Sequence, residues 1–279
     1  MKTGNNNPLV SVVILSYNNE LYIKDSIESV LNQTYKNLQI IITDDCSNDK
    51  SFEIISSFKG DERVVINRNS INLGITKNFN VGLDLCKGDY IVFTGGDDLF
   101  QEKKIEKQVK LMKSNSNLKM CYHNAFLIDE NGKYLGKNFN HKYSPFRKGD
   151  ILTSLYCGTF NCGCTTMIIN SNLKFNENIK STSDWLFYLD LLSEGGEIDF
   201  IDENLSSYRR HSNSYTYNSG YFRSLEHILT TLFLFSVRHP KYFFHALISM
   251  IYQTSLMTFN FFRIFLKAII KQTNSSKHF

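Results

Sequence analysis

The sequence is poor in residues that break or cross-link a chain. Its 279 residues include only three prolines, and its six cysteines form no C-x-x-C pair. No low-complexity linker or internal repeat is present, which excludes a solenoid or a largely disordered chain. No His/Cys pair follows Cys157, Cys162 and Cys164 at zinc-finger spacing, so we interpret the cysteines as small buried residues in a reducing compartment.

The sequence also lacks an apolar leader and an even distribution of charge. Its first residues, MKTGNNNP, do not resemble a signal peptide, so we expect the protein to remain in the cytosol. Net charge is +4, but residues 222–279 hold seven Lys/Arg, one acid and ten of the 22 phenylalanines. We therefore predict a near-neutral domain over residues 1–221 and a basic, aromatic tail over 222–279. Such a tail indicates a membrane surface as its partner rather than nucleic acid.

The tail contains 21 residues, 242–262, without Asp, Glu, Lys or Arg. This length could span a bilayer, but both flanks are basic and the segment carries several polar residues. We therefore expect it to lie in the inner face of the cell membrane as a peripheral anchor. A helical pair packed on the domain and a dimer interface are the alternatives.

Residues 1–130 alternate between strand and helix patterns. Apolar runs predict strands over residues 10–15, 38–42, 63–66 and 90–93, and amphipathic runs predict helices over 20–31, 51–58, 76–86 and 102–114. Further strands are expected over 119–123, 125–128 and 165–169. A helix is expected over 185–192, followed by a strongly helical and apolar pattern. This alternation predicts an α/β fold with a mostly parallel sheet, whose ligands bind beyond the carboxyl ends of the strands.

Two aspartate pairs follow predicted strands. Asp97-Asp98 comes after Gly95-Gly96, and Asp44-Asp45 follows the strand over residues 38–42. Glycine permits close approach of the backbone, and carboxylates are hard ligands for Mg²⁺ or Mn²⁺. The pattern therefore favours a divalent cation and a phosphate in one cleft. The alternative for each pair is a turn or a helix N-cap, a role that Asp44 in particular suits.

Dinucleotide-dependent oxidoreductases and nucleotidyltransferases do not fit the opening of the chain. No G-x-G-x-x-G follows the first strand, where Ser16-Tyr17-Asn18-Asn19 stands instead. The Gly- and Lys/Arg-rich opening loop of a nucleotidyltransferase is also missing.

Several ordered motifs over about residues 8–215 closely resemble the family 2 glycosyltransferases. The matching segments are Val10 to Asn19, Ser29 to Tyr35, Asp44-Asp45-Cys46-Ser47-Asn48-Asp49, Asn72-Leu73-Gly74 with Asn78, Asp97-Asp98, Ser183-Asp184-Trp185 with Leu189, and Tyr208-Arg209-Arg210-His211. Three positions depart from the usual family pattern: Cys46 replaces glycine, Lys77 replaces arginine, and Gly95 replaces the first aspartate of the metal motif.

The resemblance implies a GT-A fold and a UDP-sugar donor. The substrate-binding residues that it implies are Leu15, Tyr17, Asp45, Lys77, Asp97 and Arg209. By the same resemblance, Tyr17 stacks on uracil, Asp45 accepts the uracil N3–H, and Lys77 or Arg209 pairs with phosphate. Asp98, completed by His211, is implied to hold Mn²⁺ or Mg²⁺ on the diphosphate.

Asp184 is implied to be the general base for the acceptor hydroxyl. A single base without a carboxylate nucleophile implies direct displacement with inversion at the anomeric carbon. Its position before a predicted helix also suits an N-cap. The resemblance further implies a saccharide acceptor on a lipid-diphosphate carrier, with transfer of a hexose or an N-acetylhexosamine. The alternative is a non-catalytic relative that only binds carbohydrate or nucleotide sugar.

Overall fold

The computed structural model describes residues 7–139, 148–157, 163–179, 183–211, 221–255 and 258. The chain divides into two compact units, Met1–Asn218 and Ser219–Phe279. Each unit is described by itself below.

The first unit is an α/β domain built on one nine-stranded sheet. The strand order is β3-β2-β1-β4-β8-β6-β9-β5, with β7 paired to β6. The strands are β1 (Val10–Ser16), β2 (Leu38–Asp44), β3 (Val64–Arg68), β4 (Tyr90–Gly95), β5 (Leu99–Phe100), β6 (Leu118–Ile128), β7 (Tyr134–Phe139), β8 (Met167–Ile169) and β9 (Glu197–Arg209). The first four strands are parallel, as predicted, and β6 pairs with β9 in parallel as well.

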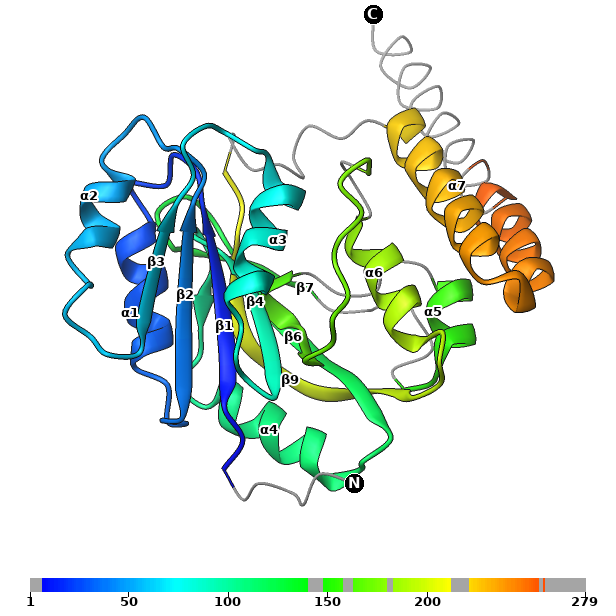
Figure 1. Cartoon of the computed structure of the whole chain (residues 1–279), viewed down its shortest axis with the longest axis horizontal. Helices are drawn as coiled ribbons and strands as arrows, with labels where there is room; N and C mark the ends of the chain where they lie inside the picture. The colour runs from blue at the N-terminus through cyan, green and yellow to red at the C-terminus, as the bar shows by residue number, and fades with distance from the viewer. Residues whose placement is uncertain are drawn as a thin grey trace, which may run out of the picture. The chain divides into compact units, whose positions relative to one another are not determined.

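Helices cover both faces of the sheet (Figure 1). They are α1 (Ile23–Leu31), α2 (Ser51–Ser56), α3 (Ile75–Leu85), α4 (Lys104–Ser114), α5 (Ile151–Cys157) and α6 (Ser183–Leu192), with a 3₁₀ turn at Gly163–Thr165. Successive residues of a strand point to opposite faces. On one face, β1 residues Val12 and Ile14 join a core with Ile27 of α1 and Val109 of α4.

Aromatic residues form the packing on the opposite face. Phe93 of β4 contacts Phe79 of α3 edge-on, with ring centroids 5.3 Å apart. Phe175 stacks on Phe79 at 4.8 Å and on Phe187 of α6 at 4.5 Å. Buried aromatic pairs of this kind contribute about 0.5–1.5 kcal/mol each beyond their apolar area. The cluster therefore fixes α3 and α6 over β4, the strand that leads to Asp97.

The structure corrects several predicted elements. One continuous strand, β6, replaces the two predicted strands, because Asn124 sits at a register shift in the β6–β9 pairing rather than in a turn. The helix predicted from residue 20 begins at Ile23, since Tyr22 N–H and Ile23 N–H both donate to the Asn19 carbonyl in a preceding turn. The largest error lies after residue 192. A helical pattern was expected there, but the chain forms the 13-residue strand β9.

The second unit is helical where it is described. It contains α7 (Tyr221–Arg238), a 3₁₀ turn at Pro240–Tyr242 and a helix over residues 243–255. None of the described helices combines the length and apolar character that crossing a bilayer requires.

Candidate active site

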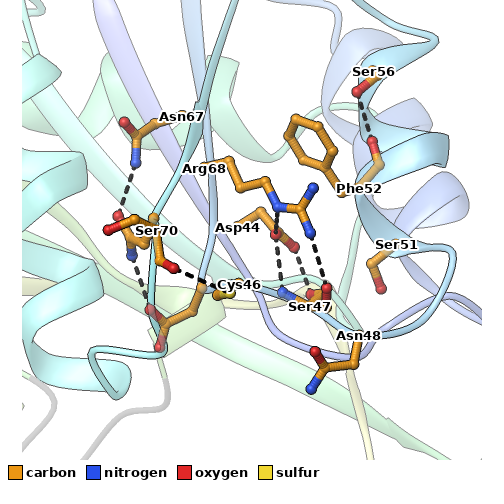
Figure 2. A network of polar contacts seen from close by, with 12 residues as sticks. Asp44, Cys46, Ser47, Asn48, Ser51, Phe52, Ser56, Asn67, Arg68 and Ser70 are labelled. Atoms are coloured by element: carbon orange, nitrogen blue, oxygen red, sulfur yellow. Dashed lines mark hydrogen bonds and ion pairs between the residues drawn. The ribbon is translucent and has the colours of Figure 1, made fainter.

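A tight turn after β2 holds the first aspartate pair (Figure 2). Asp44 is fully buried, and its carboxylate accepts the Ser47 hydroxyl at 2.5 Å and the Ser47 N–H at 3.1 Å. Arg68, at the end of β3, lies 3.5 Å from the same carboxylate, donates to the Ser47 carbonyl and covers the Phe52 ring. Asp44 therefore closes the turn; it does not cap α2, which begins seven residues later.

Asp45 fixes the start of α3. It is 3% exposed, and its two oxygens accept the Asn69 side-chain amide and the N–H groups of Leu73 and Gly74, each at 2.8 Å. Gly74 precedes α3 with φ of +82°, a backbone conformation that favours glycine. These three donors leave one of the four lone-pair positions of the carboxylate for a further donor.

The first turn of α3 presents Lys77 to solvent. Its side chain is exposed, and within the described residues it makes no hydrogen bond or ion pair. The amide groups at the start of a helix and a nearby lysine together favour an anion. Lys77 is exposed in this turn, and its contact with phosphate stays a prediction.

Tyr17 lies directly after β1 and is 45% exposed. Its N–H donates to the Asn19 side chain, and the following N–H, of Asn18, donates to the Ser47 hydroxyl of the Asp44–Ser47 turn. The Asp45 N–H also donates to the Ser16 carbonyl at 2.8 Å, so the loops after β1 and β2 are joined and Tyr17 lies in this joined region. Leu15, one residue before the strand end, accepts the Gly96 N–H at 2.7 Å and so ties β1 to the loop after β4.

The pairing of β5 with β9 assembles the second part of the site. Leu99 and Phe100 pair with Ser207 and Ser206, which brings the Asp97-Asp98 loop alongside the end of β9. Asp98 is 5% exposed, and its Oδ1 accepts the Arg209 N–H at 3.0 Å. Burial, then the neighbouring Cys164 thiol and the Asp97 carboxylate, raise the pKa of Asp98 well above its ordinary value.

Gly95 marks the point where the two carboxylates meet. A Cβ added at Gly95 would lie 2.4 Å from Asp97 Oδ1 and 3.8 Å from Asp98 Oδ2. A side chain at this position would therefore require the Asp97 carboxylate to move from its observed place.

The structure revises the hypothesis for Arg209. Its side chain is 4% exposed; its Nε donates to the Asp97 carbonyl and its Nη1 to the carbonyls of Asp129 and Glu130. The guanidinium also lies 4.6 Å from the centre of the Tyr22 ring. A guanidinium held by three carbonyls is not presented to a phosphate, so Arg209 is a scaffold residue for the Asp97-Asp98 loop.

His211 contacts Asp97, and its role in completing the metal shell beside Asp98 stays a prediction. Its Nε2 lies 3.0 Å from Asp97 Oδ2, and its ring packs on Tyr22 at a centroid distance of 5.2 Å. Sequence reasoning missed Tyr22, which supports both His211 and Arg209. Its position within the predicted helix over residues 20–31 gave no signal for this role.

The described residues contain no cluster of three His, Cys, Asp or Glu side chains that could hold a metal ion. Two carboxylates nevertheless converge at Gly95, and burial beside the Asp97 carboxylate raises the pKa of Asp98. Mg²⁺ sites in proteins commonly use one or two carboxylates and complete the shell with substrate phosphates and water. The residues present therefore fit a cation that arrives with a diphosphate.

Asp184 lies in the first turn of α6 and is half-buried. The helix begins two residues earlier than predicted, at Ser183 rather than at Trp185. Asp184 Oδ1 accepts the Trp185 N–H at 2.8 Å, and the Trp185 indole N–H donates to the Ser154 carbonyl. Burial raises the pKa of Asp184. It makes no hydrogen bond or ion pair with the other candidate residues in the described part of the chain.

Packing nevertheless places the start of α6 on the same side of the sheet as the start of α3. The Thr76 hydroxyl of α3 donates to the Ile179 carbonyl at 3.3 Å, four residues before α6 begins. Asp45 holds the preceding turn of α3, and Phe93, four residues before Asp97, contacts α6 through Phe187. Residues far apart in sequence thus belong to one connected region at the carboxyl ends of β1, β2 and β4.

Curated relatives resemble most of the chain. The putative teichuronic acid biosynthesis glycosyltransferase TuaG of Bacillus subtilis is 32% identical over 215 residues, 76% of this chain and 82% of TuaG. WfaP of Escherichia coli, named as a UDP-Glc:alpha-D-GlcNAc-diphosphoundecaprenol beta-1,3-glucosyltransferase, is 33% identical over 216 residues, 75% of this chain and 80% of WfaP. An uncharacterized glycosyltransferase of Methanocaldococcus jannaschii is 33% identical over 208 residues, 72% of this chain and 71% of that protein.

Solved structures share the fold. S. aureus TarS 1-349 in complex with UDP-GlcNAc superimposes with a TM-score of 0.65 at 17% identity, over 80% of this chain and 65% of that chain. The mannosyltransferase PcManGT from Pyrobaculum calidifontis, in complex with GDP-Man and Mn²⁺, gives 0.64 at 14% identity, over 84% and 65%. The likeness establishes the expected GT-A-like fold. The protein-family model described as "Glycosyl transferase family 2" matches residues 11–174 of this chain. The chain therefore belongs to glycosyltransferase family 2, and the protein is a glycosyltransferase.

Proposed function

We propose that the protein is an inverting, metal-dependent glycosyltransferase that moves a hexose or an N-acetylhexosamine from a UDP-sugar to a saccharide hydroxyl. The observation that carries the proposal is the convergence of Asp97 and Asp98 at Gly95, beside the loops that hold Tyr17 and Asp45. The UDP donor is further supported by TarS, which was solved with UDP-GlcNAc, and by WfaP, whose name specifies UDP-Glc.

Donor binding divides between the two ends of the nucleotide. The exposed ring of Tyr17 offers a stacking surface for uracil, and the remaining lone pair of Asp45 offers an acceptor for the N3–H. Asp97 faces the ribose or the sugar. Lys77, exposed on the first turn of α3, pairs with the diphosphate. Hydrogen bonds hold Asp45 in place, and the side chains of Tyr17 and Lys77 are exposed to solvent.

Asp98 and Asp97 would hold Mn²⁺ or Mg²⁺ together with the diphosphate, and His211 would orient Asp97. When bound, the cation supplies Lewis-acid stabilisation of the leaving diphosphate. A cation beside Asp98 would offset the rise in its pKa that burial causes.

Asp184 serves as the general base. It accepts the proton of the acceptor hydroxyl while that oxygen attacks the anomeric carbon and the bond from that carbon to the diphosphate oxygen breaks. UDP leaves with the bonding electron pair, and the configuration inverts. A raised pKa moves a carboxylate towards the range in which general bases work best at neutral pH.

The acceptor is proposed to be a growing polysaccharide on a lipid-diphosphate carrier, at the inner face of the cell membrane. WfaP is named for a diphosphoundecaprenol-linked acceptor, and TuaG for teichuronic acid biosynthesis. Each comparison covers about three quarters of this chain. The specific sugars of those relatives are not carried over.

A panel of UDP- and GDP-sugars tests the proposal. Each donor is incubated with Mn²⁺ or with EDTA, with and without a lipid-diphosphate saccharide, and nucleotide release and product configuration are measured. We expect one or two UDP-sugars to react, only with the cation, with inversion. Full activity in EDTA would refute metal dependence. Donor binding without any transfer or hydrolysis would support the non-catalytic alternative.

A further inference from the structure

The helix over residues 243–255 has an inverted burial pattern. Its buried residues are Ala246, Ser249 and Gln253, which are small or polar. Five of its exposed residues are large, apolar and regularly spaced: Phe244 at 75%, Leu247 at 43%, Ile248 at 53%, Ile251 at 62% and Tyr252 at 52%. Phe243, at 49%, and Ser255 are exposed as well. A helix that faces water normally shows the opposite arrangement.

The five regularly spaced apolar residues, Phe244 to Tyr252, form a single continuous stripe. Their spacing of i, i+3, i+4, i+7 and i+8 places all five on one side of the helix. We call these five residues the apolar stripe. Isolated exposed apolar residues are common, but a continuous set of this size marks an interaction surface.

The preceding helix adds two exposed apolar residues. Phe233 and Val237 of α7, one helical turn apart, are 59% and 62% exposed, although this helix buries Leu232 and Phe235 together with Thr231 and Ser236. In a helix pair surrounded by lipid, polar side chains are typically enclosed between helices and large apolar side chains face outward. The helix over residues 243–255 has this arrangement and points to an apolar environment beside it.

Charge identifies the kind of apolar environment. The turn between the two helices carries Arg238 and Lys241, both exposed, and the one acid of residues 222–279 is Glu226. Basic side chains beside exposed aromatic residues match an anionic headgroup layer above acyl chains. A second copy of the chain would bring like charges together, so a dimer interface is less favourable.

We infer that the apolar stripe is a docking surface for the anionic lipid of a single membrane leaflet, with Arg238 and Lys241 at the headgroups. The apolar stripe occupies one side of the helix only, and the other side buries Ala246, Ser249 and Gln253. This arrangement suits a helix that lies in one leaflet rather than one that crosses the bilayer. This inference refines the proposed membrane-face location and is independent of the transferase chemistry.

Vesicle flotation of the full-length protein tests the stripe. Vesicles of phosphatidylcholine with about one third phosphatidylglycerol are compared with pure phosphatidylcholine. We expect Leu247→Asn with Ile251→Asn to weaken binding to anionic vesicles at least about tenfold. Leu135→Asn is the matched control, because Leu135 of β7 is exposed to the same 43%. Arg238→Gln with Lys241→Gln should weaken binding several-fold, whereas Lys87→Gln with Lys110→Gln should not.

A conservative probe covers the case in which the asparagine variants fail to fold. The chain has one tryptophan, Trp185, which is 1% exposed and gives a constant background. Tyr252→Trp should show a blue shift with anionic vesicles and quenching by phospholipids brominated on their acyl chains. UDP binding is measured in parallel, so that loss of membrane binding and loss of the active site are distinguished.

Two outcomes would overturn the inference. One is equal flotation of the wild type and the stripe variant, with no spectral change at position 252. The other is a shift from dimer to monomer in the stripe variant without any loss of vesicle binding, which would assign the surface to a second copy of the chain.

Discussion

Replacing Asp98 by asparagine should stabilise the apo-protein and at the same time remove its response to metal and donor. The side chain keeps its shape, and its Oδ1 can still accept the Arg209 N–H. The new amide can donate to Asp97, whose Oδ1 lies close by at Gly95. The substitution therefore removes a buried charge without opening a cavity.

The sign of the effect follows from the raised pKa of Asp98. A carboxyl whose pKa is raised by folding lowers the stability of the folded state once it is ionised. Burial of a polar group without full compensation typically costs about 1–3 kcal/mol, so we expect Asp98→Asn to raise the free energy of unfolding by an amount of that order at neutral pH, with a corresponding rise in Tm. The pKa of Asp98 is higher in the folded protein than in the unfolded chain. The loss of stability caused by Asp98 is therefore absent at a pH below its pKa in the unfolded chain, and it grows as the pH rises towards its pKa in the folded protein. The advantage of asparagine should therefore vanish near pH 3.5.

Thermal unfolding of both proteins, with EDTA and then with Mn²⁺ and UDP, provides the assay. A ligand at 100 times its Kd stabilises the folded state by about 2.7 kcal/mol. Wild type should therefore become the more stable protein when Mn²⁺ and UDP are added. Asp84→Asn, at an exposed ion pair with Lys174, is the control and should change stability by less than about 0.5 kcal/mol. If Asp98→Asn is destabilising in EDTA, or still responds to Mn²⁺ and UDP, the reasoning is wrong.

Three further substitutions test other parts of the site. Asp184→Asn should lower turnover by about two to four orders of magnitude with nearly unchanged UDP affinity, and near-normal turnover would remove Asp184 as the base. Tyr17→Ala should weaken UDP binding by roughly 1–3 kcal/mol in calorimetry, whereas Tyr17→Phe should cost little; an equal loss in both would exclude stacking. Cys46 has φ of +60°, a left-handed backbone conformation that glycine adopts without strain, so Cys46→Gly should raise the free energy of unfolding by on the order of 0.5–1 kcal/mol. Denaturant unfolding measures this, and a loss of stability would contradict the prediction.

The first half of the fold was predictable because its signals are local. Apolar strands followed by amphipathic helices gave β1 to β4 and α1 to α4, with errors of a few residues at the ends. Strand β9 was missed because its sequence, EIDFIDENLSSYR, is mostly polar and has no regular alternation. It forms because the apolar strand β6 supplies a parallel partner over ten register positions. Long-range pairing of this kind leaves little trace in the strand itself.

The same limit applies to the active site. The sequence predicted that Asp45, Asp97 and Asp98 follow strands, and the structure brings their loops together through β1, β2 and β4. The role of Arg209 could not be predicted from the sequence, because its side chain donates to the carbonyls of Asp129 and Glu130, about 80 residues earlier in the chain. An arginine in a motif is equally compatible with phosphate binding and with holding a loop, and only burial distinguishes the two.

Gly95 stands where the family motif usually has an aspartate, and this difference affects how Mn²⁺ and UDP depend on each other for binding. Two converging carboxylates give a divalent cation fewer protein ligands than it needs, so the diphosphate and water supply the rest. Mn²⁺ should therefore bind weakly alone and much more tightly with UDP. Because coupling between two ligands is reciprocal, Mn²⁺ must raise the UDP affinity by the same factor. Calorimetric titration of each ligand, with and without the other, measures both factors. Tight Mn²⁺ binding without UDP would show that the protein completes the metal shell by itself, and that the two-carboxylate description of the site is incomplete.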